Sequence, residues 1–390
     1  MFYKFPVIHT LDDVLPAIKD REEFIVAERD WGYVVNYHVN LIDSFPEIST
    51  RNDEINAAYA MRRECRGIKF GLDRKIIARP FHKFFNVNER PETLDVNIDW
   101  NQKFSILHKM DGSMIHPINI NDEIFWCSKM GLTDVAEQAT AFVNNNTKYV
   151  SFAKAMIMRG FTPLFEWCSR SQRIVIDYPE DQLILLAARN MVTGEYLPFH
   201  NLQNCAKIYD IPVVDSFDGT FDNIKSFLED VQARDYEEGY VLRFDNGHAL
   251  KAKNLWYCQI HKVKEALAFE KDVWRIVLQN DYDDVKAFMS DEDKDRIDRF
   301  ADDLNKNIVE LADKMKWIVI ELQDRYGDSR KRFAEAVLKD YKEYSQVLFL
   351  VADGKDPEEV IRNYIMKGVN SGPKLETVRH LANNIRWEDY

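Results

Sequence analysis

The stretch LHKMDGSMIHP, residues 107–117, places Lys109 two residues before the pair Asp111-Gly112, with apolar runs on both sides. An Asp-Gly pair between two such runs is a strong signal for a β-hairpin turn. A lysine beside a turn is ordinarily a solvated surface residue, and a match as short as K-x-D-G often arises by chance. The stretch therefore predicts two strands, and it leaves open whether Lys109 is a surface residue or a nucleophile.

Two patterns divide the chain. Up to about residue 258 short strand patterns alternate with turn residues, whereas beyond it glycine and proline become scarce. From Ile297 to Leu322 apolar residues recur at spacings of three and four, which predicts a long amphipathic helix. We therefore predict an α+β protein, in which residues 1–258 form antiparallel sheets with helices and residues 259–390 form an all-α domain.

Composition narrows the class of protein. The 390 residues carry a formal net charge of −13, which argues against a protein that coats nucleic acid through bulk positive charge. Residues 61–86 hold a local excess of lysine and arginine. The five cysteines lie far apart without a C-x-x-C pair, as expected for free thiols. With no recognisable secretory signal and no membrane-spanning run, we expect a cytoplasmic protein that does not bind membranes.

A second candidate site lies in EEGYVLRFDNGHALKAK, residues 237–253, which reads as two strands around an Asn-Gly turn. If this turn has two residues, Tyr240 faces Lys253, and Glu238 and Lys251 share the same face of the hairpin. The face would then combine one carboxylate with two amines. An exposed hairpin whose lysines protect a sheet edge is the alternative.

These residue types suit nucleophilic attack on phosphorus by Lys109. A free lysine is protonated at pH 7, and neighbouring cations such as Lys251 and Lys253 would lower its pKa. The same cations would stabilise negative charge on the phosphate, and a carboxylate such as Glu238 could hold a divalent metal. The chain has no G-x-x-x-x-G-K-[ST], H-E-x-x-H or G-x-S-x-G motif for another chemistry, and its nine histidines show no metal-ligand spacing.

Four motifs in order resemble the covalent nucleotidyltransferase superfamily of ATP-dependent ligases and mRNA capping enzymes. They are K-x-D-G-S at 109–113, F-E at 165–166, E-G-Y-V at 238–241 and K-x-K at 251–253. The stretches ECRGIKF, RPFHKFFNVNE and SKMG resemble one branch, the phage RNA ligase 1 type of tRNA-repair ligases. This resemblance implies an ATP-grasp-like ligase domain. The chain departs from the pattern at Met110, where many relatives have an acidic residue.

The resemblance implies a three-step reaction with ATP and Mg²⁺ or Mn²⁺. Lysine attacks the α-phosphate, AMP moves to the 5′-phosphate of RNA, and a 3′-hydroxyl then displaces AMP. Catalytic roles are implied for Lys109, Lys251, Lys253 and Glu238. Nucleotide contacts are implied for Arg66, Lys83, His108, Lys109, Lys129, Glu166, Lys251 and Lys253, and metal contacts for Glu238 and Asp111. The implied partner is single-stranded RNA or tRNA, bound by a monomer in a phage-infected bacterial host.

Two other interpretations stay open at this stage. A DNA ligase or a capping guanylyltransferase would use the same residues, but those enzymes add a β-barrel domain where this chain reads as helical. An RNA-binding or scaffold protein that keeps the fold without turnover is disfavoured because Lys109, Glu166 and Glu238 are present together with both lysines of K-x-K. The helical domain either engages RNA or serves only in packing.

Overall fold

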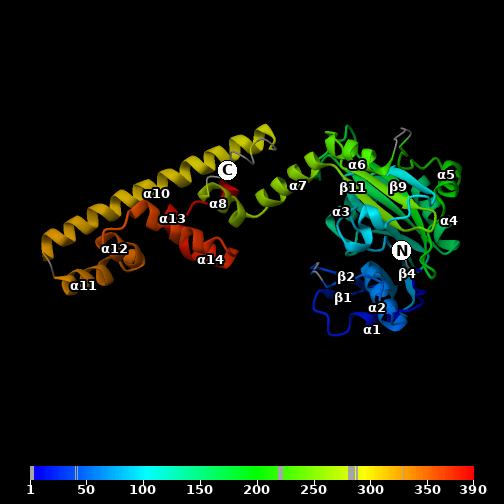
Figure 1. Cartoon of the computed structure of the whole chain (residues 1–390), viewed down its shortest axis with the longest axis horizontal. Coiled ribbons are helices and arrows are strands. Elements are labelled where there is room, and N and C mark those ends of the chain that lie inside the picture. Colours follow the sequence, from blue (N-terminus) through cyan, green and yellow to red (C-terminus); the bar gives the residue numbers. More distant parts are fainter. Residues whose placement is uncertain are drawn as a thin grey trace. The chain divides into compact units, whose positions relative to one another are not determined.

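The structure is a computed structural model, and it describes residues 4–39, 41, 43–217, 223–279, 286, 289–327 and 329–390 (Figure 1). The chain divides into two compact units, Met1–Cys258 and Gln259–Tyr390. The architecture is α+β, as the sequence predicts, with antiparallel sheets followed by helices. Within the described residues, no helix is both long and apolar enough to span a membrane.

The first unit contains three antiparallel sheets among its described residues. The first, in the order β1-β2-β3-β4, consists of Phe24–Arg29, Gly32–Tyr37, Arg66–Gly71 and Ile76–Ala78. The second, in the order β11-β10-β5, consists of Ala249–Lys253, Gly239–Phe244 and Phe104–His108. The third, in the order β7-β6-β8-β9, consists of Glu123–Cys127, Ser113–Ile120, Phe161–Cys168 and Gln182–Asn190. The last two sheets carry the motifs.

Helices accompany these sheets and complete their cores. They are α1 (Leu11–Ile18), α2 (Asp53–Glu64), α3 (Asp134–Asn144), α4 (Lys148–Met158), α5 (Phe199–Ile208) and α6 (Ile224–Ala233), with short 3-10 turns η1 (Pro91–Thr93) and η2 (Asp95–Asn97). Helices α3, α4 and α5 bury their apolar residues against the third sheet, whereas Phe227 and Val231 of α6 pack on the second. Burial of these apolar faces leaves one face of the second sheet for other contacts.

The Asp111-Gly112 pair does not close a hairpin, contrary to the prediction. Strand β5 pairs with β10, whereas β6 pairs with β7 and β8, so the pair connects two different sheets. A Cβ at Gly112 would lie 2.3 Å from the Trp167 carbonyl oxygen. Glycine is therefore required here because the loop passes close to the backbone of β8.

The register of β10 and β11 also differs from the prediction by one residue. Val241 pairs with Lys251 and Gly239 pairs with Lys253, because the turn holds three residues and ends at Gly247 with φ +86°. A one-residue change moves every side chain to the other face of the strand. Tyr240 is therefore buried in the core under α6, opposite the lysines.

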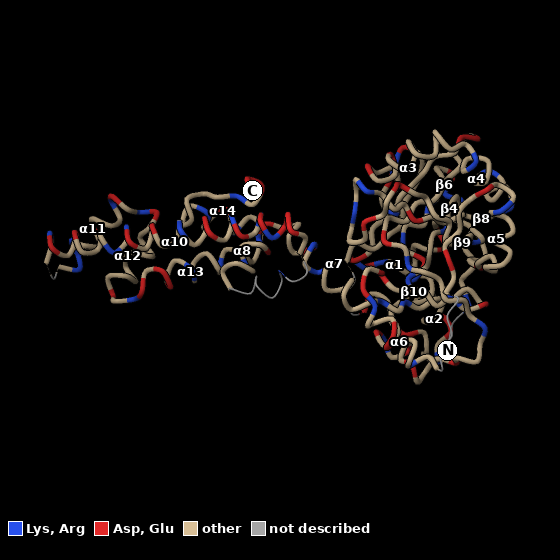
Figure 2. The backbone as a smooth tube through the Cα atoms, turned by 90° about the horizontal axis from the view of Figure 1, so that it is seen from above, with Lys and Arg blue, Asp and Glu red and all other residues tan. Residues whose placement is uncertain are grey.

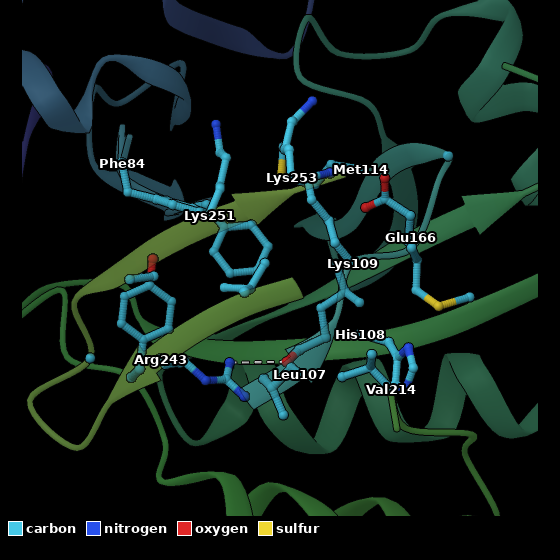
Figure 3. A pocket seen from close by; sticks show the side chains of 18 of the residues that line it. Phe84, Leu107, His108, Lys109, Met114, Glu166, Val214, Arg243, Lys251 and Lys253 are labelled. Carbon is cyan, nitrogen blue, oxygen red and sulfur yellow. Dashed lines mark hydrogen bonds between the residues drawn. The ribbon is translucent and has the colours of Figure 1, made fainter. Parts of the chain in front are cut away.

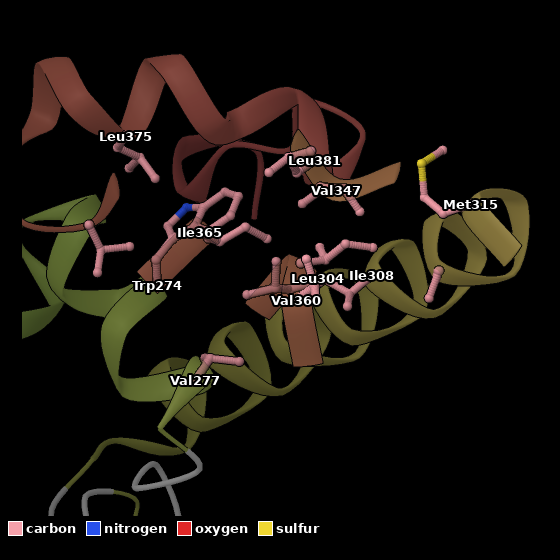
Figure 4. Packing of buried hydrophobic residues seen from close by; sticks show 14 of the residues in the cluster. Trp274, Val277, Leu304, Ile308, Met315, Val347, Val360, Ile365, Leu375 and Leu381 are labelled. Carbon is pink, nitrogen blue, oxygen red and sulfur yellow. The ribbon is translucent and has the colours of Figure 1, made fainter. Parts of the chain in front are cut away.

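The second unit is helical and has its own hydrophobic core (Figure 4). The helices after β11 are α7 (Leu255–Leu267), α8 (Glu270–Leu278), α10 (Asp291–Tyr326), α11 (Arg330–Asp340), α12 (Ser345–Ala352), α13 (Pro357–Gly368) and α14 (Gly372–Val378), with η3 (Lys342–Tyr344), η4 (Arg379–Ala382) and η5 (Trp387–Asp389). Helix α10 contains the predicted amphipathic stretch and buries Phe300, Leu304 and Ile308. Figure 2 shows its acidic and basic residues interspersed.

Candidate active site

A cavity of ≈ 270 Å³ lies against the face of the second sheet that α6 does not cover. The β10 residues that line it are Val241 and Arg243, and β11 contributes Lys251 and Lys253. Alternate residues of a strand share a face, so the pairing that buries Tyr240 also presents these side chains to the cavity. Figure 3 labels Arg243, Lys251 and Lys253 among the residues that line the cavity.

Lys109 enters this cavity directly after β5. Its backbone N–H donates to the carbonyl oxygen of Gly239, 2.9 Å away, which ties the lysine to the first residue of β10. Its Nζ lies 2.7 Å from Oε1 of Glu238, and the Nζ of Lys253 lies 3.2 Å from the same oxygen. Glu238 is only 4% exposed. The amines of Lys109 and Lys253, which belong to two different motifs, therefore contact one carboxylate oxygen of a third motif.

The pKa of Lys109 is raised, which corrects the expectation that neighbouring cations lower it. Burial alone would lower the pKa of this amine, but the carboxylates of Glu238 and Glu166 outweigh burial. The amine is therefore an ammonium at neutral pH. To act as a nucleophile, this amine would first have to lose a proton.

Two other groups of the cavity titrate near neutral pH. Burial raises the pKa of Glu166 to about 8, with Lys109 opposing and Glu238 assisting this shift. Burial lowers the pKa of Lys251 to about 7, and the positive charges of Arg66 and Lys109 add to the effect. Glu166 thus carries a proton at pH 7, while Lys251 is close to half-protonated. Perturbed pKa values of this kind are typical of functional sites.

A group of cations surrounds Tyr37 at the end of β2, and we call Tyr37, Arg66, Lys83 and Lys129 the Tyr37 cluster. The Nζ atoms of Lys129 and Lys83 lie 4.7 and 5.3 Å from the Tyr37 ring centroid. Burial would raise the pKa of Tyr37, but the charges of Arg66, Lys83 and Lys129 lower it. Arg66 also lines the cavity that contains Lys109. The cluster therefore adjoins the cavity as a surface suited to anions.

A fully buried lysine holds part of the Tyr37 cluster together. The Nζ of Lys69 donates to the carbonyl oxygens of Gly67 and Ser128, each 3.0 Å away. These residues are sequence neighbours of Arg66 and Lys129. A Cβ at Gly67 would lie 2.5 Å from the Lys129 carbonyl oxygen, so the two backbone segments touch. Neither Lys69 nor Tyr37 was assigned a role from the sequence: Lys69 lies in the stretch ECRGIKF and Tyr37 in no quoted motif, and only the packing of β3 against this turn reveals their contacts.

Asp111 lies behind the cavity, and its carboxylate is fully engaged. Its Oδ2 accepts from the backbone N–H groups of Val175 and Ile176, both 2.7 Å away, and its Oδ1 accepts from the Tyr257 hydroxyl at 2.6 Å. The Tyr178 hydroxyl also accepts from the Asp111 N–H at 2.9 Å. These bonds anchor the loop that follows Lys109. Both carboxylate oxygens therefore already accept hydrogen bonds from the protein, and a metal contact for Asp111 stays a prediction.

The Glu238 carboxylate suits a metal that is held jointly with a nucleotide. Among the described residues, no group of three or more His, Cys, Asp or Glu side chains could hold a metal ion alone. Mg²⁺ is usually bound by one or two carboxylates together with substrate phosphates. Glu238 meets that requirement, because its carboxylate lies 2.7 Å from the Lys109 amine, whereas Glu166 carries a proton at pH 7.

The predicted residues fall into three groups. Those that line the cavity are Arg66, His108, Lys109, Glu166, Lys251 and Lys253. Glu238 bonds the Lys109 amine there, whereas Lys83 and Lys129 belong to the Tyr37 cluster and Asp111 to the loop behind. Arg243 also lines the cavity and was missed, because an arginine in a strand carries no motif signal.

A family model for RNA ligases matches residues 64–267, which include every motif described above. The chain belongs to the RNA ligase family. RNA ligases are enzymes that form phosphodiester bonds, so the match favours this interpretation over a DNA ligase or a capping enzyme. A protein of Thermovibrio ammonificans, provisionally named an RNA ligase, is 26% identical over 319 residues, 78% of this chain and 80% of that protein.

Two solved RNA ligases also show similarity. An RNA ligase of Naegleria gruberi with pyrophosphate is 20% identical with a TM-score of 0.35, and the match covers 41% of this chain and 52% of that one. An archaeal ATP-dependent RNA ligase is 14% identical with a TM-score of 0.44, over 65% of this chain and 64% of that one. The chain thus spans only 52% and 64% of these two structures.

Proposed function

We propose that the chain is an ATP-dependent RNA ligase that joins 5′-phosphate and 3′-hydroxyl ends of single-stranded RNA, as in tRNA repair. A covalent lysine–AMP at Lys109 and an RNA-adenylate are the intermediates. The observation that carries the proposal is the Lys109 amine, held 2.7 Å from Glu238 at a cavity that it shares with Lys251 and Lys253. A solvated surface lysine would have no such partners.

The first step forms a bond between the Lys109 Nζ and the α-phosphorus of ATP. The bond from that phosphorus to the bridging oxygen breaks, and pyrophosphate leaves with the electron pair. An ammonium has no free electron pair, so Lys109 must lose its proton before it attacks. Glu238 is the carboxylate that holds this proton in a hydrogen bond, and it is placed to move the proton away.

Different cations bind different phosphates of ATP. Lys251 and Lys253 contact the α-phosphate and stabilise the charge that develops on it. The Tyr37 cluster binds the outer phosphates, which become pyrophosphate. Glu166, which carries a proton at pH 7, donates a hydrogen bond to a ribose hydroxyl or accepts one from it. A divalent metal, Mg²⁺ or Mn²⁺, held by Glu238 and the phosphates would supply additional neutralisation of phosphate charge.

Two further steps complete the ligation. AMP moves from Lys109 to the 5′-phosphate of an RNA strand, which restores the free lysine. A 3′-hydroxyl then attacks the activated phosphate, a phosphodiester forms, and AMP leaves. We further propose that residues 1–258 carry the adenylyl transfer, that residues 259–390 engage RNA or tRNA, and that the enzyme works as a cytoplasmic monomer in a phage-infected bacterium.

The test is incubation of the full chain with ATP and Mg²⁺ or Mn²⁺, followed by intact-protein mass spectrometry. We expect a mass gain of one AMP on the wild-type chain and none on Lys109→Ala. Lys103→Ala is the matched control, because this exposed lysine lies just before the same strand. Added 5′-phosphorylated single-stranded RNA should discharge the AMP and yield circles or longer strands.

Absence of AMP on the wild-type chain with either metal would show that the covalent mechanism is wrong. AMP that persists on Lys109→Ala would place the nucleophile elsewhere. A parallel reaction with GTP separates ATP-dependent ligation from capping, because a guanylyltransferase would gain GMP instead.

A further inference from the structure

Two aromatic side chains lie together on the surface of the first unit, and we call Tyr236 and Trp256 the aromatic pair. Their ring centroids are 5.1 Å apart, with the ring planes tilted by 49°. Tyr236 is nevertheless 77% exposed. Neither residue is among the described residues that line the ≈ 270 Å³ cavity. An aromatic ring that stays largely in water gains little from burial, so packing alone does not account for Tyr236.

The backbone at Tyr236 is also strained. Its φ is +65°, in the left-handed region that favours glycine. A bulky side chain is unfavourable in this region, and strained residues of this kind cluster at functional sites. The chain thus carries at position 236 a side chain that neither its backbone conformation nor its packing favours. The exposed ring itself is therefore the feature to explain.

The aromatic pair is tied to the Glu238 carboxylate from both sides. Tyr236 lies two residues before Glu238, which limits the distance between their Cα atoms to about 7 Å. The Asn254 N–H donates to the Glu238 carbonyl oxygen at 3.1 Å, which brings the start of α7, with Trp256, to the same place. The Glu238 carboxylate in turn contacts the Lys109 amine at 2.7 Å. The pair therefore lies beside the amine that would carry AMP.

The size and charge of this surface fit a nucleotide base. Leu255 is also exposed and extends the patch, but three side chains are few beside the roughly 20–30 residues that each side of a stable protein interface contributes. Residues 234–238 hold one arginine against three acidic residues, which disfavours a phosphate or an anionic lipid at the ring itself. Every base has a π-face that stacks on an aromatic ring.

We propose that the aromatic pair is a platform on which one base of the single-stranded RNA stacks, close to the strand end that reacts at Lys109. This inference rests on the proposed function, because it concerns the RNA to which AMP is transferred. The platform holds the base through its π-face, and the sugar–phosphate chain continues to the lysines of the cavity. Unpaired bases are free to stack in this way, so the platform favours single strands without selecting a sequence.

The test separates the loading of AMP from its transfer to RNA. The full chain is loaded with ATP and Mg²⁺ or Mn²⁺, and discharge of AMP to 5′-phosphorylated single-stranded RNA is followed by intact-protein mass spectrometry. Tyr236→Ala should raise KM for RNA by about 5- to 150-fold, as expected for one lost stacking contact, without changing KM for ATP. Tyr236→Phe keeps the ring and should match the wild type. Met158→Ala is the matched control, because it removes another exposed apolar side chain.

Glycine at position 236 distinguishes a binding role from a structural one. Tyr236→Gly removes the ring and also the strain at φ +65°, so the variant should resist urea at least as well as the wild type. Its KM for RNA should nevertheless rise as in Tyr236→Ala. A residue with a structural role alone would show the reverse, a loss of stability with an unchanged KM for RNA.

Abasic RNA tests whether a base is the occupant. In a series of 5′-phosphorylated strands that each lack one base, one strand should show a KM on the wild-type chain that is raised by the same factor. On Tyr236→Ala that strand should behave like intact RNA. A KM that is the same for every abasic strand on the wild type would overturn the proposal, and so would a strand that stays equally sensitive on the variant.

The outcomes separate this inference from the proposed function. If AMP is loaded and both Tyr236→Ala and Tyr236→Gly pass it to RNA with the KM of the wild type, the stacking role is refuted. If the chain takes up no AMP, or never passes it to RNA, the proposed function fails instead. If Tyr236→Ala does not fold, Tyr236→Gly takes its place in both series.

Discussion

Replacing Lys69 with methionine tests how the Tyr37 cluster is held together. The Lys69 ammonium donates to the carbonyl oxygens of Gly67 and Ser128, 3.0 Å away, and to Nε2 of His116 at 2.9 Å. Burial and the Lys69 charge hold the pKa of His116 well below its usual range, so its neutral Nε2 can accept. Lys69→Met keeps much of the volume but removes these three bonds and a longer one to the Lys129 carbonyl oxygen at 3.3 Å.

The magnitude follows from two opposing effects. Three buried acceptors lose their donor, at about 1–3 kcal/mol each. Burial lowers the pKa of Lys69 from 10.5 to about 8, and at ~1.4 kcal/mol per pH unit the variant recovers about 3 kcal/mol by no longer burying a charge. The net expectation is a loss of about 3 kcal/mol in the free energy of unfolding, together with a several-fold higher KM for ATP.

Urea unfolding of the full chain measures the loss, and self-adenylylation measures KM and kcat. The matched control is Lys75→Met, because the Lys75 side chain is 74% exposed and the change should cost less than about 0.5 kcal/mol. We expect kcat to change little, since Lys69 does not contact Lys109 or Glu238. Unchanged stability and unchanged KM in Lys69→Met would refute the reasoning.

Dependence on pH supplies a second readout for Lys69. The folded pKa, about 8, is lower than the unfolded value of 10.5, so the unfolded chain binds more protons between these two values. Through this group, the free energy of unfolding of the wild type should therefore rise with pH across that window. Cys127 and Arg29 also act on the Lys69 charge and are unchanged in Lys69→Met. The variant should lack this rise, which urea titrations at pH 8 and pH 10 would reveal.

Three further predictions concern the cavity. The pKa of Lys251 is about 7, and a bound phosphate favours the charged form of this amine, so ATP binding above pH 7 should take up a proton and weaken as pH rises. Calorimetry in buffers of different ionisation enthalpy would detect the proton uptake. If no proton is taken up, the contact between Lys251 and phosphate is contradicted. Glu238→Gln should lower the pKa of Lys109, because it removes one of the carboxylates that raise this pKa. The rate at which an amine-reactive reagent modifies Lys109 should then rise at lower pH than in the wild type. An unshifted pH profile would count against the ion pair. Tyr257→Phe removes the 2.6 Å bond to Asp111 and should cost about 1–3 kcal/mol of unfolding free energy, whereas an unchanged urea midpoint would show that the bond does not anchor the loop.

The motifs were sufficient to identify the cavity, although local turn rules were wrong at two places. Lys109, Glu166 and the K-x-K lysines meet at one cavity, as their order along the chain led us to expect. The hairpin predicted at Asp111-Gly112 was wrong because Gly112 allows the loop to pass close to the Trp167 carbonyl oxygen. The dipeptide Asp-Gly alone does not distinguish a hairpin turn from such a backbone contact. The register of β10 failed because Asn-Gly sits in a three-residue turn, and the error moved Tyr240 to the wrong face.

The sequence by itself determined which reactive groups the chain has, the order of its motifs and the change from strand to helix near residue 258. Such properties depend on residue type and on spacing along the chain, and both can be read directly from the sequence. Only the tertiary structure decided that carboxylates outweigh cations around Lys109, that Lys69 joins the backbone segments next to Arg66 and Lys129, and that Arg243 lines the same cavity. These features depend on distance and burial between segments remote in sequence, and electrostatic energies change steeply with both.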